Sequence, residues 1–572
     1  MARTNDDVAA VLEEYADLLA ITGHEDFKIR VYQKAARSIG AYPDDIAGYD
    51  AGALRQIPNV GESIAAKVAE YLSSGTMTKL EELRGRVPAG VRALTHIPTL
   101  GPKRAMELHR HLGVDSPERL EAAIQAGALH GLPGFGPKTE ENLLHGIALM
   151  RDAGERVHLG VAMPLAEDVV AALQAVHGCR RCDYAGSLRR MKDTIGDIDV
   201  LATSNRPRVL MDAFAGLPQV SEVIVRGDKK TSVRTVQGLQ VDLRVVPPDA
   251  WGAAMQYFTG AKAHNIRTRE IALHHKLKLS EYGVFDAVTE EKIVSKTEEE
   301  VYRRLGLPWI PPTLREDTGE IEAALAGELP ELVTEADVRG DLHTHTDLTD
   351  GHAPLEDMVA AAAERGYAYY AVTDHGPDLY MQQMTLDKAT AQRERLRRLD
   401  GTAGLRLLHG IELNIDPDGE VDWPPDVLAD FDLCVASVHS HFDLPRAKTT
   451  RRLVRAARNP RVNIIGHPSA RLIGRRPPID ADWDQVFQAC ARSGTALEIN
   501  AFPDRLDLAA ELIRRARSYG VRFAVDSDAH AIGHLANIRY GIGTAQRGWL
   551  TAEDVINTWP LDRLTAFLRK NR

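Results

Sequence analysis

The chain has 572 residues, which is too many for one hydrophobic core and predicts several domains. With 44% hydrophobic and 26% charged residues it has the composition of globular protein, and no apolar run approaches the ~18–20 residues of a membrane span. A net charge of −11 argues against a protein that merely coats DNA, and four cysteines in this length argue against a disulfide framework. The N-terminus is acidic and has no apolar core of a signal peptide, so we expect a cytoplasmic protein.

Residues 1–150 read as short helices separated by Gly and Pro, and they contain an internal repeat. Three segments share the pattern apolar-Pro-x-apolar-Gly followed by a helix, and the pattern glycines are Gly61, Gly101 and Gly136. A turn glycine lets a ligand approach the backbone, and the next helix offers free N–H groups to phosphate. The repeat resembles the helix-hairpin-helix family, which implies DNA binding without base reading. A plain helix-turn-helix corner is the alternative.

The segment YAGSLRRMKDTIGDIDVLAT predicts a turn and a helix start followed by a strand. On a strand, Asp197 and Asp199 point to one face, and Asp242 in LQVDLRVV belongs to another strand. Three such carboxylates can hold two Mg²⁺ or Mn²⁺ ions for in-line phosphoryl transfer. Ser187 and Arg190 can hold phosphates. A DxD pair alone is typical of a solvated strand edge, but the combined spacing of GSLRR, GDIDV and VDLRV is more specific.

Residues 1–315 resemble the family X DNA polymerases. The resemblance rests on the hairpins, on GSLRR, GDIDV and VDLRV, and on YFTGAKAHNIRTRE. It implies an N-terminal helix-hairpin-helix domain, further DNA-binding hairpins, an α+β nucleotidyltransferase palm and a nucleotide-selection domain. We place these four parts at residues 1–85, 86–155, 156–250 and 251–315.

The resemblance also implies site residues. Asp197, Asp199 and Asp242 become metal ligands, and Asp242 also accepts the proton of the primer 3′-hydroxyl. The implied nucleotide contacts are Ser187, Arg190, Gly196, Tyr257, Phe258, Asn265 and Arg269. Among them Tyr257 and Phe258 exclude a 2′-hydroxyl or, alternatively, only pack in the core.

Two lysines of the first domain match family positions. Lys67 matches the lysine that attacks an abasic sugar as a Schiff base, which requires a neutral amine. A second lysine of the family's 5′-phosphate pocket is Ser63 here, so Lys67 is either the lyase nucleophile or a simple DNA contact. Lys34 is either a 5′-phosphate contact or a solvated surface lysine.

Residues 338–572 follow an acidic linker, residues 316–337, and repeat an apolar strand followed by an amphipathic helix. His and acidic residues at about seven strand ends predict a β/α barrel of seven units with its site on that face. Mixed His and carboxylate ligands suit Mn²⁺, Zn²⁺ or Fe²⁺, and nine candidates imply two to three ions.

This pattern resembles the PHP (polymerase and histidinol phosphatase) family. Its nine ligand positions match His343, His345, Asp350, His375, Glu412, His439, His467, Asp528 and His530. We expect Asp341, Asp374 and Asp526 to orient imidazoles. An extended strand would put His441 on the face of His439, where it is either a ligand or, alternatively, a surface histidine or a substrate contact.

Together the two resemblances imply a multidomain, monomeric enzyme with a distorted (β/α)7 PHP barrel after the palm. Gapped or nicked double-stranded DNA and dNTPs would be its partners, with no membrane. Its expected activities are template-directed gap filling in DNA repair and metal-dependent 3′→5′ exonuclease or 3′-end phosphoesterase cleavage. One alternative is a nucleotidyltransferase for a non-DNA substrate fused to a sugar-phosphate phosphatase. A catalytically silent scaffold on DNA ends is the other.

Overall fold

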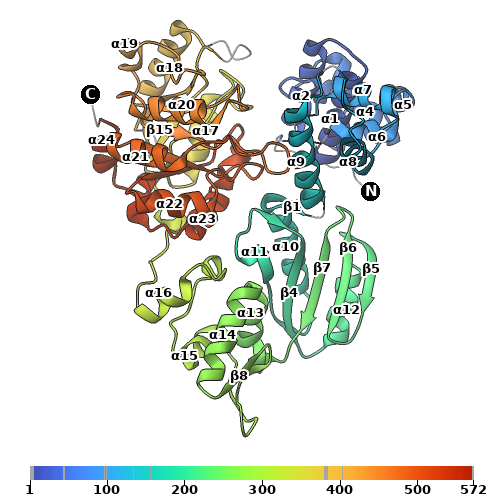
Figure 1. The fold of residues 1–572 in the computed structure, drawn as a ribbon, viewed down its shortest axis with the longest axis vertical. Helices are drawn as coiled ribbons and strands as arrows, with labels where there is room; N and C mark the ends of the chain where they lie inside the picture. Colours follow the sequence, from blue (N-terminus) through green and yellow to red (C-terminus); the bar gives the residue numbers. More distant parts are fainter. Residues whose placement is uncertain are drawn as a thin grey trace.

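The computed structural model describes residues 5–40, 42, 46–95, 97, 100–132, 134–154, 156–378, 384–401 and 404–569. Figure 1 shows a helical N-terminal part, a palm sheet with the small domain that follows it, and a C-terminal barrel. This arrangement of helices, an α+β palm and a seven-unit barrel confirms the expected fold class. Among the described helices, none combines the length and the apolarity that crossing a membrane would require.

The N-terminal part is all helical. Its helices are α1 (Asn5–Ile21), α2 (Asp26–Gly40), α3 (Ala51–Leu54), α4 (Glu62–Ser74), α5 (Thr78–Arg84), α6 (Ala89–Thr95), α7 (Pro102–Leu112), α8 (Pro117–Gln125) and α9 (Pro137–Gly154). Gly61 and Gly101 are the N-cap residues of α4 and α7, and the Gly136 carbonyl accepts the N–H of Thr139 in the first turn of α9. One hydrophobic cluster runs from Val8 to Ile147, so these helices share a core.

The palm is a five-stranded sheet in the order β2-β4-β7-β6-β5. Its elements are β1 (Val157–His158), α10 (Leu159–Gln174), β2 (Cys179–Tyr184), α11 (Gly186–Arg189), β3 (Thr194–Ile195), β4 (Asp197–Ser204), α12 (Pro207–Ala215), β5 (Val220–Arg226), β6 (Lys230–Thr235) and β7 (Gln240–Val245). Strand β4 runs parallel to β7. Ile198 and Val200 of β4 and Val241 of β7 are buried with residues of α10 and α12, so the strands turn one face to a core.

A small helical domain with a three-stranded antiparallel sheet follows the palm. It comprises η1 (Pro248–Ala250), α13 (Trp251–Thr259), α14 (Lys262–His274), β8 (Leu277–Ser280), β9 (Gly283–Asp286), β10 (Lys292–Val294), α15 (Glu298–Arg304) and η2 (Pro312–Leu314). The linker then forms α16 (Glu320–Ala326) and η3 (Glu335–Asp337). It is packed, because Glu320 is fully buried against His264 and Val333 belongs to the barrel core.

The barrel has seven parallel strands in chain order, β11 to β17. They are β11 (Gly340–Asp341), β12 (Tyr369–Val372), β13 (Arg406–Asn414), β14 (Leu433–Ser437), β15 (Ile464–Gly466), β16 (Ala496–Asn500) and β17 (Phe523–Asp526). A bridge between Thr344 and Ala529 joins the loops that follow the first and last strands, so the barrel is nearly closed.

Helices surround this sheet, as expected for parallel strands. They are α17 (Leu355–Glu364), α18 (Leu386–Leu399), α19 (Pro425–Leu428), α20 (Arg446–Arg458), α21 (Trp483–Ser493), α22 (Ala510–Ser518), η5 (Ile532–Asn537), α23 (Ile538–Arg547), η6 (Ala552–Asp554), η7 (Ile556–Thr558) and α24 (Leu561–Leu568). Helix α23 also touches the palm, because Tyr540 joins the palm core and Arg539 Nη1 donates to Glu167 Oε1 at 2.9 Å.

Candidate active sites

The palm sheet brings the three expected carboxylates to one face. Asp197 and Asp199 lie on β4, and Asp199 is the register partner of Asp242 on β7. Burial, followed by repulsion from Asp197 and Asp242, raises the pKa of Asp199 to about 6. A site that penalises its own negative charge in this way favours a bound cation.

Two neighbours hold the Asp242 carboxylate. Lys230 Nζ lies 2.5 Å from Asp242 Oδ2, and Gln240 Nε2 donates to Oδ1 at 3.0 Å. Burial alone would raise the pKa of Asp242, but the hydrogen bonds from Lys230, Ser232 and Gln240 outweigh it and lower that pKa. Sequence reasoning missed Lys230, because its proximity depends on the register of β6 against β7.

The turn before β4 approaches the carboxylates closely. Gly186 has φ +65°, and a Cβ there would lie 2.8 Å from Asp199 Oδ2, so only glycine fits without a shift. Ser187 follows it on α11, and Gly196 precedes β4 with Arg156 Nη1 3.0 Å from where a Cβ would be. Arg190 is already engaged, because Nε donates to Glu316 Oε1 at 2.8 Å and Nη1 to the Thr259 carbonyl at 2.8 Å.

The expected nucleotide-selection residues lie on α13 and α14. The rings of Tyr257 and Phe258 meet edge to face at 5.1 Å, and the Arg244 guanidinium lies 4.8 Å from the Phe258 ring centre. Asn265 Nδ2 donates to the carbonyls of Tyr257 at 2.6 Å and of Gly260 at 3.1 Å. The Asn265 amide therefore fixes the end of α13. Arg269 Nε donates to the Asn265 backbone carbonyl, and the Arg269 side chain is exposed.

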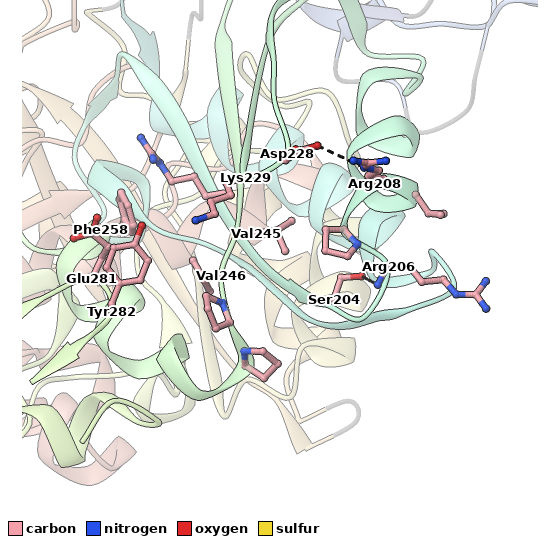
Figure 2. A pocket seen from close by; sticks show the side chains of 15 residues that line it. Ser204, Arg206, Arg208, Asp228, Lys229, Val245, Val246, Phe258, Glu281 and Tyr282 are labelled. Atoms are coloured by element: carbon pink, nitrogen blue, oxygen red, sulfur yellow. Dashed lines mark hydrogen bonds and ion pairs between the residues drawn. The ribbon is translucent and has the colours of Figure 1, made fainter. Parts of the chain in front are cut away.

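A cavity of about 650 Å³ opens beside Phe258. Figure 2 shows Lys229 and Val245 between Tyr282 on one side and Arg206 and Arg208 on the other. The lining is mainly apolar, with four basic residues and two acidic ones, and it includes none of the three palm carboxylates. The basic residues are Arg206, Arg208, Lys229 and Arg244, and the acidic ones are Asp228 and Glu281.

The barrel gathers its expected ligands at the carboxyl ends of the strands. The ligand atoms form three groups, and within each group they all lie within 4.8 Å of one another. Some residues belong to more than one group. The groups are His345, Asp350, His375 and His530; His343, His345 and Asp528; and His375, Glu412 and His439. His467 joins through its Nε2, which lies 3.0 Å from Glu412 Oε1.

Glu412 is the centre of this cluster. Its Oε2 lies 2.8 Å from His375 Nδ1, and its Oε1 lies 3.1 Å from His439 Nε2 as well as close to His467. Burial and the nearby Arg505 lower the pKa of His467 to about 3. Burial also opposes protonation of His343 and His375, but nearby carboxylates outweigh it and raise their pKa values.

The donor set fits metal ions by its unmet bonding capacity. Within the described part of the chain, the buried atoms His343 Nε2, both ring nitrogens of His345, and Asp350 Oδ1 make no hydrogen bond. Buried polar atoms that point into one cluster without hydrogen bonds are costly unless a cation satisfies them. Imidazole and carboxylate together suit Mn²⁺, Zn²⁺ or Fe²⁺.

The carboxylate that orients an imidazole is Glu498 on β16. Glu498 Oε1 lies 2.6 Å from His343 Nδ1, and Oε2 accepts the backbone N–H of His467. Sequence reasoning identified ALEIN as the end of a strand but assigned no role to Glu498, since its partner His343 lies 155 residues away in the loop after β11.

The three acids expected to orient imidazoles hold other groups instead. Asp341 accepts from the hydroxyl and backbone N–H of Ser527, Asp374 from the backbone N–H and hydroxyl of Thr346, and Asp526 from the backbone N–H of Leu342. That expectation was wrong, because the loops after the strands expose backbone donors that need acceptors. These acids therefore fix the loops that carry the ligands.

The expectation that His441 shares an extended strand with His439 was also wrong. Strand β14 ends at Ser437, and His441 has φ 55° and is exposed. Its Nδ1 lies 3.0 Å from Ser440 Oγ, outside the three ligand groups.

In the N-terminal part, a Cβ built on Gly61, Gly101 or Gly136 meets no described atom within 4 Å. The three turns are therefore open to a ligand. Lys67 Nζ donates to Ser63 Oγ at 2.8 Å and to the Ser63 carbonyl at 3.0 Å. The serine that replaces the family lysine is thus a direct partner of Lys67. Lys34 is half-buried on α2.

Comparisons with known proteins match the same regions. Family models match as follows: helix-hairpin-helix domain at residues 3–77, SAM-like helix-hairpin-helix tandem at 91–148, DNA polymerase beta thumb at 254–316 and PHP domain at 341–502. The chain is 34% identical over 569 residues to the DNA polymerase/3'-5' exonuclease PolX of Bacillus subtilis (strain 168), with 99% of each chain covered.

Shorter relatives match about two fifths of the chain. A probable phosphatase of Syntrophotalea carbinolica is 30% identical over 232 residues, which are 38% of this chain and 90% of the relative. A probable phosphatase of Thermoanaerobacter sp. (strain X514) is 27% identical over 246 residues, which are 41% and 95% of the two chains.

Proposed function

Because the chain belongs to the family X DNA polymerases that carry a C-terminal PHP domain, we propose that it fills short gaps in DNA with dNTPs and trims or cleans 3′ ends at the barrel site. The observation that carries the proposal is the pair of separate clusters, the carboxylates of β4 and β7 and the His and acid groups of the barrel. Open hairpin turns in the N-terminal part supply a place for the DNA backbone.

In the palm, Asp197, Asp199 and Asp242 would hold two Mg²⁺ or Mn²⁺ ions. When bound, such ions neutralise the triphosphate and make the primer hydroxyl more acidic. Asp242 would accept the proton of the primer 3′-hydroxyl, and Lys230, which pairs with Asp242, would hold that carboxylate in its ionised form. Ser187, Arg190 and Gly196 would contact the triphosphate, and Tyr257 and Phe258 would pack by the sugar. Asn265 and Arg269 would lie against the new base pair.

In the barrel, the nine His and acid residues would hold two to three Mn²⁺, Zn²⁺ or Fe²⁺ ions. Bound ions of this kind supply a nucleophile at neutral pH and polarise the phosphoryl group. Glu412 would bridge the two sides of the cluster, and Glu498 would keep the His343 ring oriented through Nδ1. Arg505, which lies 3.7 Å from Asp528, is placed to meet the phosphate of a 3′ end.

A gapped duplex whose primer ends in a 3′-phosphate tests this division of labour. We expect the wild type to remove the phosphate and extend the primer, Asp199→Ala to clean without extending, and His343→Ala to extend only primers with a free 3′-hydroxyl. The exposed residues Asp168 and His441 provide the controls Asp168→Ala and His441→Ala, which should match the wild type. Loss of end cleaning in Asp199→Ala, or of extension from a clean primer in His343→Ala, would contradict the proposal.

A further inference from the structure

The palm turn that carries Arg190 is held by the C-terminal barrel. Arg547, the last residue of α23, donates from Nη1 to the Arg190 backbone carbonyl at 3.2 Å. The same nitrogen donates to Glu316 Oε1 at 3.1 Å, and Arg190 Nε donates to that oxygen at 2.8 Å. One linker carboxylate oxygen therefore binds one arginine from the palm and one from the barrel.

This junction carries more positive than negative charge. Lys192 Nζ lies 3.9 Å from the same Glu316 oxygen, and the Arg190 and Arg547 side chains are each only 12% exposed. Burial, followed by the nearby Arg547, lowers the pKa of Lys192. A partly buried surplus of cations around one carboxylate favours the arrival of a further anion.

Two more contacts from the barrel fix the residues after Arg190. Arg471 Nη1 lies 3.1 Å from Asp193 Oδ2. On α23, a Cβ at Gly543 would lie 2.5–2.9 Å from the Met191 side chain, so glycine allows Met191 to pack against this helix. The segment 190–193, which leads through β3 to the carboxylate strand β4, is therefore contacted by three barrel residues.

Arg190 has one nitrogen left for a ligand. Its Nε is bound to Glu316 and its Nη1 to the Thr259 carbonyl, while Nη2 makes no hydrogen bond to the part of the chain that the structure describes. Without Arg547, Glu316 would depend more strongly on Arg190 for its neutralisation. A triphosphate would then have to compete with that stronger ion pair for the guanidinium.

We propose that Arg547 of the PHP barrel is a positioning residue for nucleotide incorporation, because it shares Glu316 with Arg190 and holds segment 190–193 so that Arg190 can meet the triphosphate. The inference rests on the proposed polymerase function of the palm. Through this contact the barrel has a role in nucleotide binding that is separate from its own metal cluster.

Steady-state incorporation on a one-nucleotide gap tests the inference with variants of the full chain. Arg547→Gln should raise the KM for dNTP about tenfold, the value of one charge-assisted hydrogen bond, and leave kcat within about twofold. Arg547→Lys should give an intermediate KM. The matched control is Arg539→Gln, since Arg539 pairs with Glu167 across the same interface without touching segment 190–193. This control should keep the wild-type KM.

A double variant separates positioning from general damage. If Glu316 competes for Arg190, combining Arg547→Gln with Glu316→Gln should lower the raised KM for dNTP most of the way back to the wild-type value. Cleavage of 3′ ends should stay within about twofold of the wild type in every variant, which reports an intact barrel. Equal effects of Arg547→Gln and Arg539→Gln, or a double variant worse than Arg547→Gln, would overturn the inference alone. Failure of the wild type to incorporate dNTP would instead overturn the polymerase function on which it rests.

Discussion

Replacing Glu498 by glutamine should weaken the barrel metal site selectively. Glu498 is fully buried, and its Oε1 lies 2.6 Å from His343 Nδ1. Its Oε2 accepts from the His467 backbone N–H and from Asn500 Nδ2 at 3.2 Å. A glutamine can keep the first contact through its carbonyl, but its amide nitrogen would then face two donors, and the negative charge behind the imidazole would be lost.

The expected magnitude follows from these contacts. A buried donor left without its acceptor costs about 1–3 kcal/mol, and partners that orient metal ligands typically contribute about 10–100-fold in metal affinity. This range corresponds to about 1.4–2.8 kcal/mol. We therefore expect the Mn²⁺ concentration that half-saturates 3′-end cleavage to rise about 10–100-fold in Glu498→Gln, while dNTP incorporation on a clean gap stays unchanged.

The assay is a Mn²⁺ titration of 3′-end cleavage on metal-stripped protein, with calorimetric Mn²⁺ binding as an activity-free readout. Glu511→Gln on the exposed side of α22 is the control for losing one glutamate charge from the barrel. Unchanged Mn²⁺ affinity in Glu498→Gln would refute the reasoning. So would an equal loss of polymerase activity, because it would indicate general unfolding instead of a loosened ligand.

Two further predictions concern the palm. Gly186→Ala places a Cβ 2.8 Å from Asp199 Oδ2 in a backbone with φ +65°, so the site must carry about 1–2 kcal/mol of backbone strain as well as this contact, and dNTP incorporation should fall at least about tenfold. The control is Gly238→Ala, which has φ +84° and no described atom near the new Cβ, so it carries the strain without the contact and should lose less incorporation. Burial opposes ionisation of Glu298, but Arg315 and Arg189 lower its pKa to about 2 from 4.5. A depressed acid pKa stabilises the fold above the unfolded value and loses this effect as pH falls from about 4.5 to 2, so Glu298→Gln should cost about 3 kcal/mol at pH 7 and progressively less below pH 4.5. Thermal unfolding across pH checks this, and a pH-independent difference would contradict it.

The sequence could predict residues whose position follows from local pattern. Most barrel ligands lie at or just after the end of a short apolar run, and the carboxyl ends of parallel strands meet at one face, so convergence of His343 with Asp528 follows from strand order. The alternation of a strand likewise places Asp197 and Asp199 on the same side. These inferences require only the spacing along the chain and the handed, repetitive geometry of β/α units.

What the sequence could not predict depends on contacts across elements. Lys230 reaches Asp242 because of the register of β6 against β7. Glu316 of the linker meets Arg547 because the barrel packs against the linker and the palm. The roles of Asp341 and Asp374 depend on which donor lies nearest in a folded loop. Several such contacts have similar energies, so pattern alone does not choose among them.

The near-closure of the barrel bears on synthesis. Thr344, just after the first strand, bridges to Ala529, just after the last, and His343 and His345 share one ligand group with Asp528. The hydrolytic centre therefore cannot assemble on a nascent chain until residues 528–530 have left the ribosome, by which time every palm residue has already emerged. The palm is not finished earlier, because Tyr540 joins its core and Arg547 contacts segment 190–193, so the proposed polymerase and 3′-end sites would both be completed only after α23 has emerged.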